Sequence, residues 1–162
     1  AIASDASVLV AGTNSAHVHV WQPPQAPKAD DAAPPSGADP LTPARASAQY
    51  DKLAMFEAHS EDTYLLKVVI SPDAQSIATT ASDNTVRMWR RNGRVWELDQ
   101  VLAQHQRWVW DACFSADSAY LVTASSDHTA LLWDLASGEV IRHYTGHSLA
   151  LTSVALNDSS RP

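Results

Sequence analysis

Short apolar runs separated by polar turns repeat along most of this 162-residue chain. The runs are five to eight residues long and rich in Val, Leu, Ile and aromatic residues, and Asp, Ser, Asn and Gly interrupt them. Apolar runs of this length predict β-strands, several of them buried on both faces. The expected strands are residues 8–12, 17–21, 51–57, 64–70, 76–81, 85–90, 95–102, 108–114, 120–124, 129–133, 140–144 and 151–156, and Asn92-Gly93 is a hairpin turn signal.

Polar positions repeat along the chain with a period near 44 residues. Each period has a histidine, an aspartate and a tryptophan, at His59, Asp83 and Trp89, then at His105, Asp127 and Trp133, and His147 begins another period. Residues 70–90 and 114–134 align without a gap. A period of this length, with His near its start and Trp near its end, is typical of a propeller blade with four strands. The chain thus resembles the WD-repeat family over almost all of its length outside residues 22–50.

The resemblance implies an all-β fold, the WD-repeat β-propeller, of which only part is expected here. A closed ring needs four to eight blades, and seven blades at this period would take roughly 300 residues. We therefore expect the C-terminal half of a seven-bladed propeller, about three to four blades that do not close into a ring. The expected blades are residues 1–57, 58–103 and 104–145, and residues 146–158 are the first strand of the closing blade.

The first repeat is degenerate and interrupted. Trp21 matches the later tryptophans, but Ser15 stands at the aspartate position and Ala11 at the threonine position. Trp21 and Trp89 are 68 residues apart, so against a spacing of 44 this repeat contains an insertion of 24 residues. Residues 22–50 carry seven prolines and many Ala and Asp, a composition that cannot form a β-ladder or a core. We expect a disordered surface loop there.

A hydrogen-bonded tetrad of His, Ser or Thr, Asp and Trp ties the strands of a blade together in the WD-repeat family. The resemblance implies two tetrads here, His59, Thr79, Asp83 and Trp89 in one blade and His105, Thr123, Asp127 and Trp133 in the next. The donors and acceptors of these side chains are complementary. Hydroxyl, imidazole and carboxylate together could also suggest a hydrolase triad, but no G-x-S-x-G motif is present and the set recurs in each repeat. We therefore predict structural roles and no catalytic residue.

Charge and composition narrow the possible partners. The net charge of −7 argues against a nucleic-acid backbone or an anionic membrane surface as partner. No apolar run approaches the length of a membrane span. The single cysteine, Cys113, lies in an expected strand, which indicates a core residue in a reducing compartment. The histidines that begin the repeats have structural roles and no zinc-type spacing occurs, so neither a metal nor a cofactor is expected.

Function on a propeller has to be sought among surface positions. Aligned blades carry core residues at three positions of the first strand, namely Leu65, Val68 and Ile70, then Val109, Ala112 and Phe114, then Leu151, Val154 and Leu156. Trp108 and Trp110 fall outside this core set, and Tyr64 and Leu66 match them in the preceding blade. Clustered exposed aromatic residues are typical of protein contacts, although one of each pair could pack between blades. We predict a protein-binding site at these four residues, with Gln106, Arg107 and Lys67 as its polar rim.

Residues 105–128 and the GH…VALND ending are similar to one group in this family, the G-protein-β-subunit-like WD-repeat subunits of TOR kinase complexes. This resemblance implies a scaffold that binds and stabilises the kinase catalytic domain and supports TOR signalling. It implies a cytoplasmic protein, or one peripheral to endomembranes through its complex. The alternative is a WD-repeat scaffold of another multiprotein complex. An enzyme would need non-repeating polar residues that converge in the central channel, and we identify none.

Overall fold

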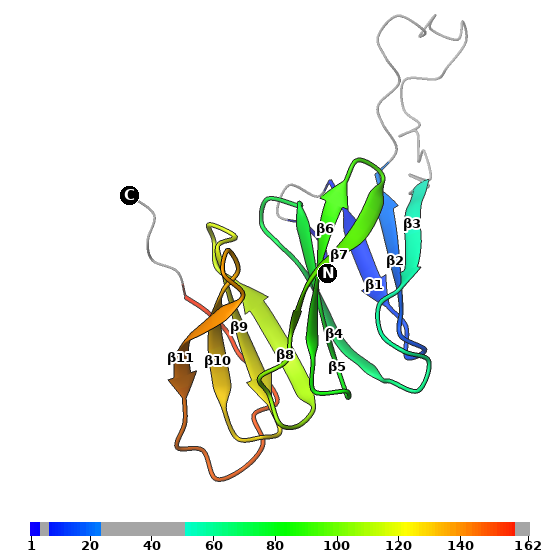
Figure 1. Ribbon diagram of the computed structural model, residues 1–162. Helices are drawn as coiled ribbons and strands as arrows, with labels where there is room; N and C mark the ends of the chain where they lie inside the picture. The colour runs from blue at the N-terminus through cyan, green and yellow to red at the C-terminus, as the bar shows by residue number, and fades with distance from the viewer. Residues whose placement is uncertain (4–6, 24–50, 158–162) are drawn as a thin grey trace, which may run out of the picture.

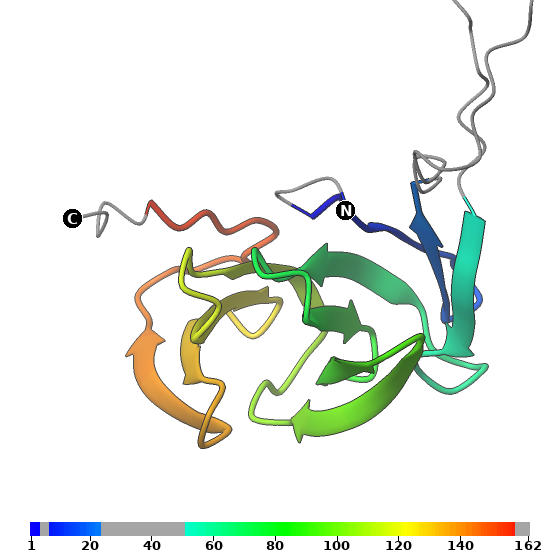
Figure 2. The ribbon, with the colours of Figure 1, turned by 90° about the horizontal axis from the view of Figure 1, so that it is seen from above.

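The computed structural model describes residues 1–3, 7–23 and 51–157. These residues form three antiparallel β-sheets and no helix, which confirms the all-β prediction. The sheets follow one another around an open arc (Figure 1), which is clearest from above in Figure 2. Within the described ranges no helix has the length and apolar character needed to cross a membrane. Residues 24–50 lie outside these ranges, so the expected surface loop stays a prediction.

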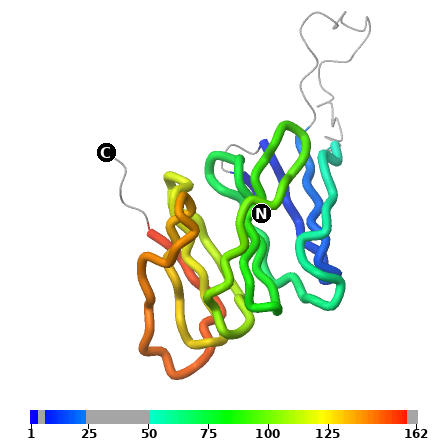
Figure 3. Tube along the Cα trace, viewed as in Figure 1, coloured from blue at the N-terminus to red at the C-terminus, as the bar shows by residue number. Residues whose placement is uncertain are grey.

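Each sheet is made of strands that are consecutive in the sequence, as the Cα trace in Figure 3 makes plain. Sheet 1 contains β1 (Leu9–Gly12), β2 (His17–Gln22) and β3 (Asp51–Glu57). Sheet 2 contains β4 (Leu65–Ile70), β5 (Ser76–Ala81), β6 (Val86–Asn92) and β7 (Val95–Leu102). Sheet 3 contains β8 (Val109–Phe114), β9 (Tyr120–Ser125), β10 (Ala130–Asp134) and β11 (Glu139–Tyr144).

Most strand bounds agree with the sequence pattern to within two residues, and β3, β5 and β7 agree at both ends. The predicted hairpin turn is confirmed, because Asn92 pairs with Val95 and Gly93 between them has a φ of 62°. Glycine adopts that left-handed conformation at little cost.

Residues 151–156, which the apolar pattern predicts as a strand, form no strand in the structure. The segment is held beside sheet 3 by separate hydrogen bonds. The Leu151 amide donates to the Ser125 carbonyl at 3.0 Å, and the Val154 amide donates to Oδ2 of Asp111 at 3.0 Å. At Val154, a side-chain carboxylate therefore accepts the amide hydrogen bond that a backbone carbonyl would accept in a β-ladder. Leu156, expected in the core, is 42% exposed.

Two hydrophobic cores fill the spaces between neighbouring sheets. The first lies between sheets 1 and 2 and includes Val10, Val20, Ile77 and Trp89, with the Phe56 ring centred 4.4 Å from the indole of Trp89. The second lies between sheets 2 and 3 and includes Val86, Met88, Val109, Leu121, Leu131 and Trp133. Because each sheet buries residues on faces that meet its neighbours, the sheets stabilise one another in the arc.

Candidate docking site

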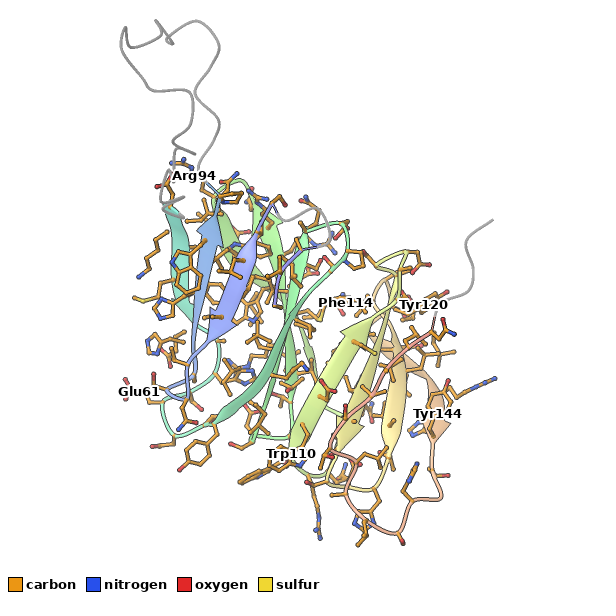
Figure 4. The ribbon with its side chains drawn as sticks, turned by 180° about the vertical axis from the view of Figure 1, so that it is seen from behind. Glu61, Arg94, Trp110, Phe114, Tyr120 and Tyr144 are labelled. Carbon is orange, nitrogen blue, oxygen red and sulfur yellow. The ribbon has the colours of Figure 1, made fainter. Side chains whose placement is uncertain are left out.

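Four segments meet at one end of sheets 2 and 3. Residues 58–64 lead into β4 and residues 103–108 lead into β8, and the other two segments are the turns at 82–85 and 126–129. We call this the aromatic end. It is the lower end in Figure 4, where Glu61 and Trp110 are labelled, and Phe114 and Tyr120 lie toward the opposite end.

The four residues of the predicted tetrad in sheet 3 are hydrogen-bonded in a chain. Nδ1 of His105 lies 2.7 Å from Oδ2 of Asp127, and Nε2 lies 2.7 Å from Oγ1 of Thr123. The indole N–H of Trp133 donates to the same Thr123 oxygen at 2.9 Å. Because a carboxylate faces Nδ1, the imidazole donates there and accepts at Nε2 from the threonine hydroxyl.

The same chain occurs in sheet 2 with slightly longer distances. His59 lies 2.9 Å from Asp83 and 3.0 Å from Thr79, and Trp89 donates to Thr79 at 3.1 Å. The structure thus brings together all four members of each set. Sheet 1 lacks this chain, because its corresponding positions are Ala11 and Ser15.

Hydrogen bonding keeps the tetrad carboxylates ionised. Burial alone would raise the pKa of Asp127, but hydrogen bonds from Thr129, His105 and the Gln106 amide outweigh it and lower the pKa to about 2. Asp83 likewise has a pKa of about 2, because hydrogen bonds from His59 and Thr85 outweigh its burial. Burial lowers the pKa of His105 below its usual 6.5, although Asp127 acts in the opposite direction.

The tetrad of sheet 3 also fixes the loop that carries the aromatic residues. Oδ2 of Asp127 accepts the Gln106 amide at 3.0 Å, and the Ser125 hydroxyl donates to the Arg107 carbonyl at 2.9 Å. The Ser126 amide donates to the Trp108 carbonyl at 2.9 Å. Three successive residues of the loop are therefore tied to β9 and the turn after it, so the side chains beyond them are presented from a pre-organised backbone.

Tyr64, Trp108 and Trp110 form an aromatic cluster at this end. The ring centroids of Tyr64 and Trp108 are 6.4 Å apart, and those of Trp108 and Trp110 are 5.6 Å apart. Tyr64 is 53% exposed and Trp108 is 42% exposed. The Trp110 indole is half-buried and donates to Oγ of Ser126 at 2.6 Å, so Trp110 supports the ring of Trp108. No hydrogen bond joins the Trp108 indole N–H or the Tyr64 hydroxyl to another described residue, which leaves both polar groups available.

The other residues of the predicted site have different surroundings. Gln106 and Arg107 are exposed, whereas Leu66 is half-buried in β4. The Lys67 ammonium lies 2.8 Å from Oδ1 of Asp111, so its charge joins β4 to β8. Asn84, Gln106, Arg107, Trp108 and Ser126 line an open pocket of about 350 Å³ beside the cluster.

Sequence reasoning missed Asp111 as an organising residue. Its side chain is 9% exposed and accepts hydrogen bonds from Lys67, from the Ser153 hydroxyl and from the Val154 amide. Burial would raise the pKa of Asp111, but these three partners lower it. The sequence signal that could have identified Asp111 is its charge, because it is an acidic residue within the otherwise apolar run 108–114. Among the described residues no cluster of three His, Cys, Asp or Glu side chains could hold a metal ion.

Comparisons with known proteins agree with this architecture. The family model described as "WD domain, G-beta repeat" matches residues 50–90 and 96–134. "Target of rapamycin complex subunit wat1" of Schizosaccharomyces pombe is 43% identical over 97% of this chain and 44% of its own length. "Target of rapamycin complex subunit LST8" of Saccharomyces cerevisiae is 40% identical over 97% of this chain and 45% of its own length. "Protein LST8 homolog" of Drosophila melanogaster is 34% identical over 62% of this chain and 31% of its own length.

The chain therefore spans less than half the length of the first two relatives. The first match spans β3, β4, β5 and most of β6, and the second spans most of β7 and all of β8, β9 and β10. The three antiparallel sheets in an open arc have the arrangement of propeller blades. The chain contains WD repeats, and its three sheets form part of a β-propeller.

Proposed function

We propose that this chain is part of a non-catalytic WD-repeat subunit of a TOR kinase complex in the cytoplasm. The observation that carries the proposal is the match, along 97% of the chain, to two proteins named as target of rapamycin complex subunits. A non-catalytic role is supported by the recurrence of the same polar residues in sheets 2 and 3. In both sheets the histidine and the aspartate are hydrogen-bonded to each other within the blade. We assign residues 1–57, 58–103 and 104–145 to three blades and residues 146–158 to a further one.

The aromatic end is the surface that we assign to the kinase catalytic domain, which the subunit would bind and stabilise. Exposed Trp and Tyr on a rigid backbone supply a large contact area at a small entropic cost. Trp108 combines 42% exposure with a loop whose backbone is held by three hydrogen bonds, two of them to the side chains of Asp127 and Ser125. Trp110 contributes through its contact with Trp108, so we expect the largest loss of binding at Trp108.

The test is affinity purification of the full-length protein with its associated proteins identified by mass. Trp108→Ala, alone or with Trp110→Ala, should abolish recovery of a TOR kinase while the circular dichroism spectrum stays unchanged. Tyr120→Ala is the matched control, because Tyr120 is 39% exposed and lies toward the opposite end. Undiminished kinase recovery with Trp108→Ala would contradict the docking surface. Recovery of a different assembly by the unaltered protein would favour a general WD-repeat scaffold.

A further inference from the structure

Unpaired charges of opposite sign adjoin the two exposed residues of the aromatic cluster in the sequence. Arg107 is exposed directly before Trp108, and Glu61 and Asp62 are exposed just before Tyr64. None of the three forms an ion pair with another residue of the described part of the chain. By contrast, Lys67 and Arg90 at other positions are paired, with Asp111 and Asp99. Unpaired charges beside an exposed aromatic cluster are available to a partner.

The Arg107 side favours an acidic group. The pocket beside Trp108 is lined by Asn84, Gln106, Ser126 and the guanidinium-bearing Arg107, so its charge is positive and its other polar groups are neutral. The backbone of Arg107 is fixed by the Ser125 hydroxyl at 2.9 Å, and the guanidinium remains free to form a bidentate pair. Guanidinium groups match carboxylates in that geometry.

The Tyr64 side favours a basic group. Ser60 and Thr63 close the turn that carries Glu61 and Asp62, through side-chain oxygens 2.8 Å apart and an amide-to-carbonyl hydrogen bond of 2.9 Å. Two adjacent carboxylates on this short turn create a local negative potential in a chain whose net charge is already −7. Glu61 and Trp110 lie at the same end of the molecule, as Figure 4 shows.

We propose that the aromatic end binds a polypeptide segment in which an apolar anchor lies between a basic and an acidic side chain. The anchor contacts Tyr64 and Trp108, the carboxylate enters the pocket at Arg107, and the basic group faces Glu61 and Asp62. This inference rests on the proposed function in treating the aromatic end as the docking surface. The charge order fixes the direction of the segment across sheets 2 and 3, because the reversed direction would place like charges together.

Short synthetic peptides with a tryptophan–leucine core test the charge order directly. The probes carry lysines on one flank and glutamates on the other, lysines on both, or glutamates on both, and fluorescence anisotropy measures their binding to the full-length protein. We expect the bipolar peptide to bind about tenfold more tightly than either single-sign peptide at low salt. Arg107→Glu should remove this preference and favour the all-lysine peptide. Arg142→Glu, at an exposed position on β11, should leave the preference intact.

Equal binding of the three peptides, or equal effects of Arg107→Glu and Arg142→Glu, would overturn the inference. Self-association of the full-length protein that Arg107→Glu removes would assign the surface to a second copy and would also overturn it. Binding of a TOR kinase catalytic domain separates this inference from the proposed function. If the kinase fails to bind but the peptides are discriminated, only the proposed function fails. If the kinase binds through Trp108 but the three peptides bind equally and Arg107→Glu does not change their affinities, only the charge order fails.

Discussion

The hydroxyl of Thr123 is the centre of the sheet 3 tetrad, since it contacts both the His105 imidazole and the Trp133 indole N–H. Thr123→Val keeps the shape of the side chain and leaves Nε2 of His105 and the N–H of Trp133 buried without their shared partner. We expect a loss of about 2–4 kcal/mol in the free energy of unfolding, measured by urea denaturation. Thr152→Val, at an exposed position, should change it by less than about 0.5 kcal/mol. Equal effects of the two substitutions would contradict a structural role for the tetrad.

Protonation of the tetrads should make stability depend on pH in two windows. The native pKa of His105 is below 6.5, so between that lowered value and 6.5 the unfolded chain binds a proton that the native protein does not. Lowering the pH through this window therefore destabilises the protein. Asp83 and Asp127, with a pKa of about 2 against an ordinary 3.8, contribute stability that is complete above 3.8 and is lost as the pH falls through 2.

The measurement that checks this is the urea midpoint from pH 8 to pH 2, with the His105 ring followed by NMR. The midpoint should stay level above pH 7 and decline below about 6.5, and His105 should remain neutral at pH 6.5. A native His105 that becomes protonated above pH 6.5 would reverse the sign of the first window and refute the prediction.

At the scale of elements, Asp111 joins three segments, because its carboxylate contacts Lys67 of β4 and Ser153 and Val154 of the C-terminal segment. Asp111→Ala removes the acceptor of the Val154 amide. Hydrogen exchange at Val154 should then be roughly 10–100 times faster, since a hydrogen bond to a charged acceptor contributes about 1.5–3 kcal/mol. Glu139→Ala, at an exposed position on β11, serves as control. Unchanged exchange at Val154 would mean that other contacts hold this segment.

The strands could be predicted from sequence because two independent features of the sequence, the turn residues and the internal repeat, indicate the same boundaries. Each apolar run is bounded by turn residues, and residues 70–90 and 114–134 repeat it in register. Residues 151–156 have the apolar run, but composition alone could not reveal that the Asp111 carboxylate accepts the Val154 amide in place of a ladder carbonyl. The different roles of Trp108 and Trp110 depend on the position of Ser126, 16 residues beyond Trp110. Such long-range contacts are not encoded in local periodicity.

At the scale of the whole molecule, neighbouring sheets stabilise one another. The two cores lie between sheets, so an outer face without a neighbouring sheet exposes surface that a closed ring would bury. Exposed apolar side chains include Met55 on β3, Ile141 on β11, and Leu149 and Leu156 beyond it, each more than 40% exposed. Apolar groups beside unpaired strand edges promote association between chains.

We therefore expect an isolated polypeptide of residues 1–162 to self-associate at micromolar concentrations, whereas the full-length protein should stay monomeric. Size-exclusion chromatography with light scattering over a range of concentrations gives the mass directly. Leu149→Glu with Leu156→Glu should reduce the association, because charge at an exposed position opposes contact between like surfaces. Tyr64→Glu is the informative comparison, since the aromatic end lies apart from the outer faces and should not affect self-association. A strictly monomeric 1–162 polypeptide would show that the described sheets need no further neighbours to remain apart in solution.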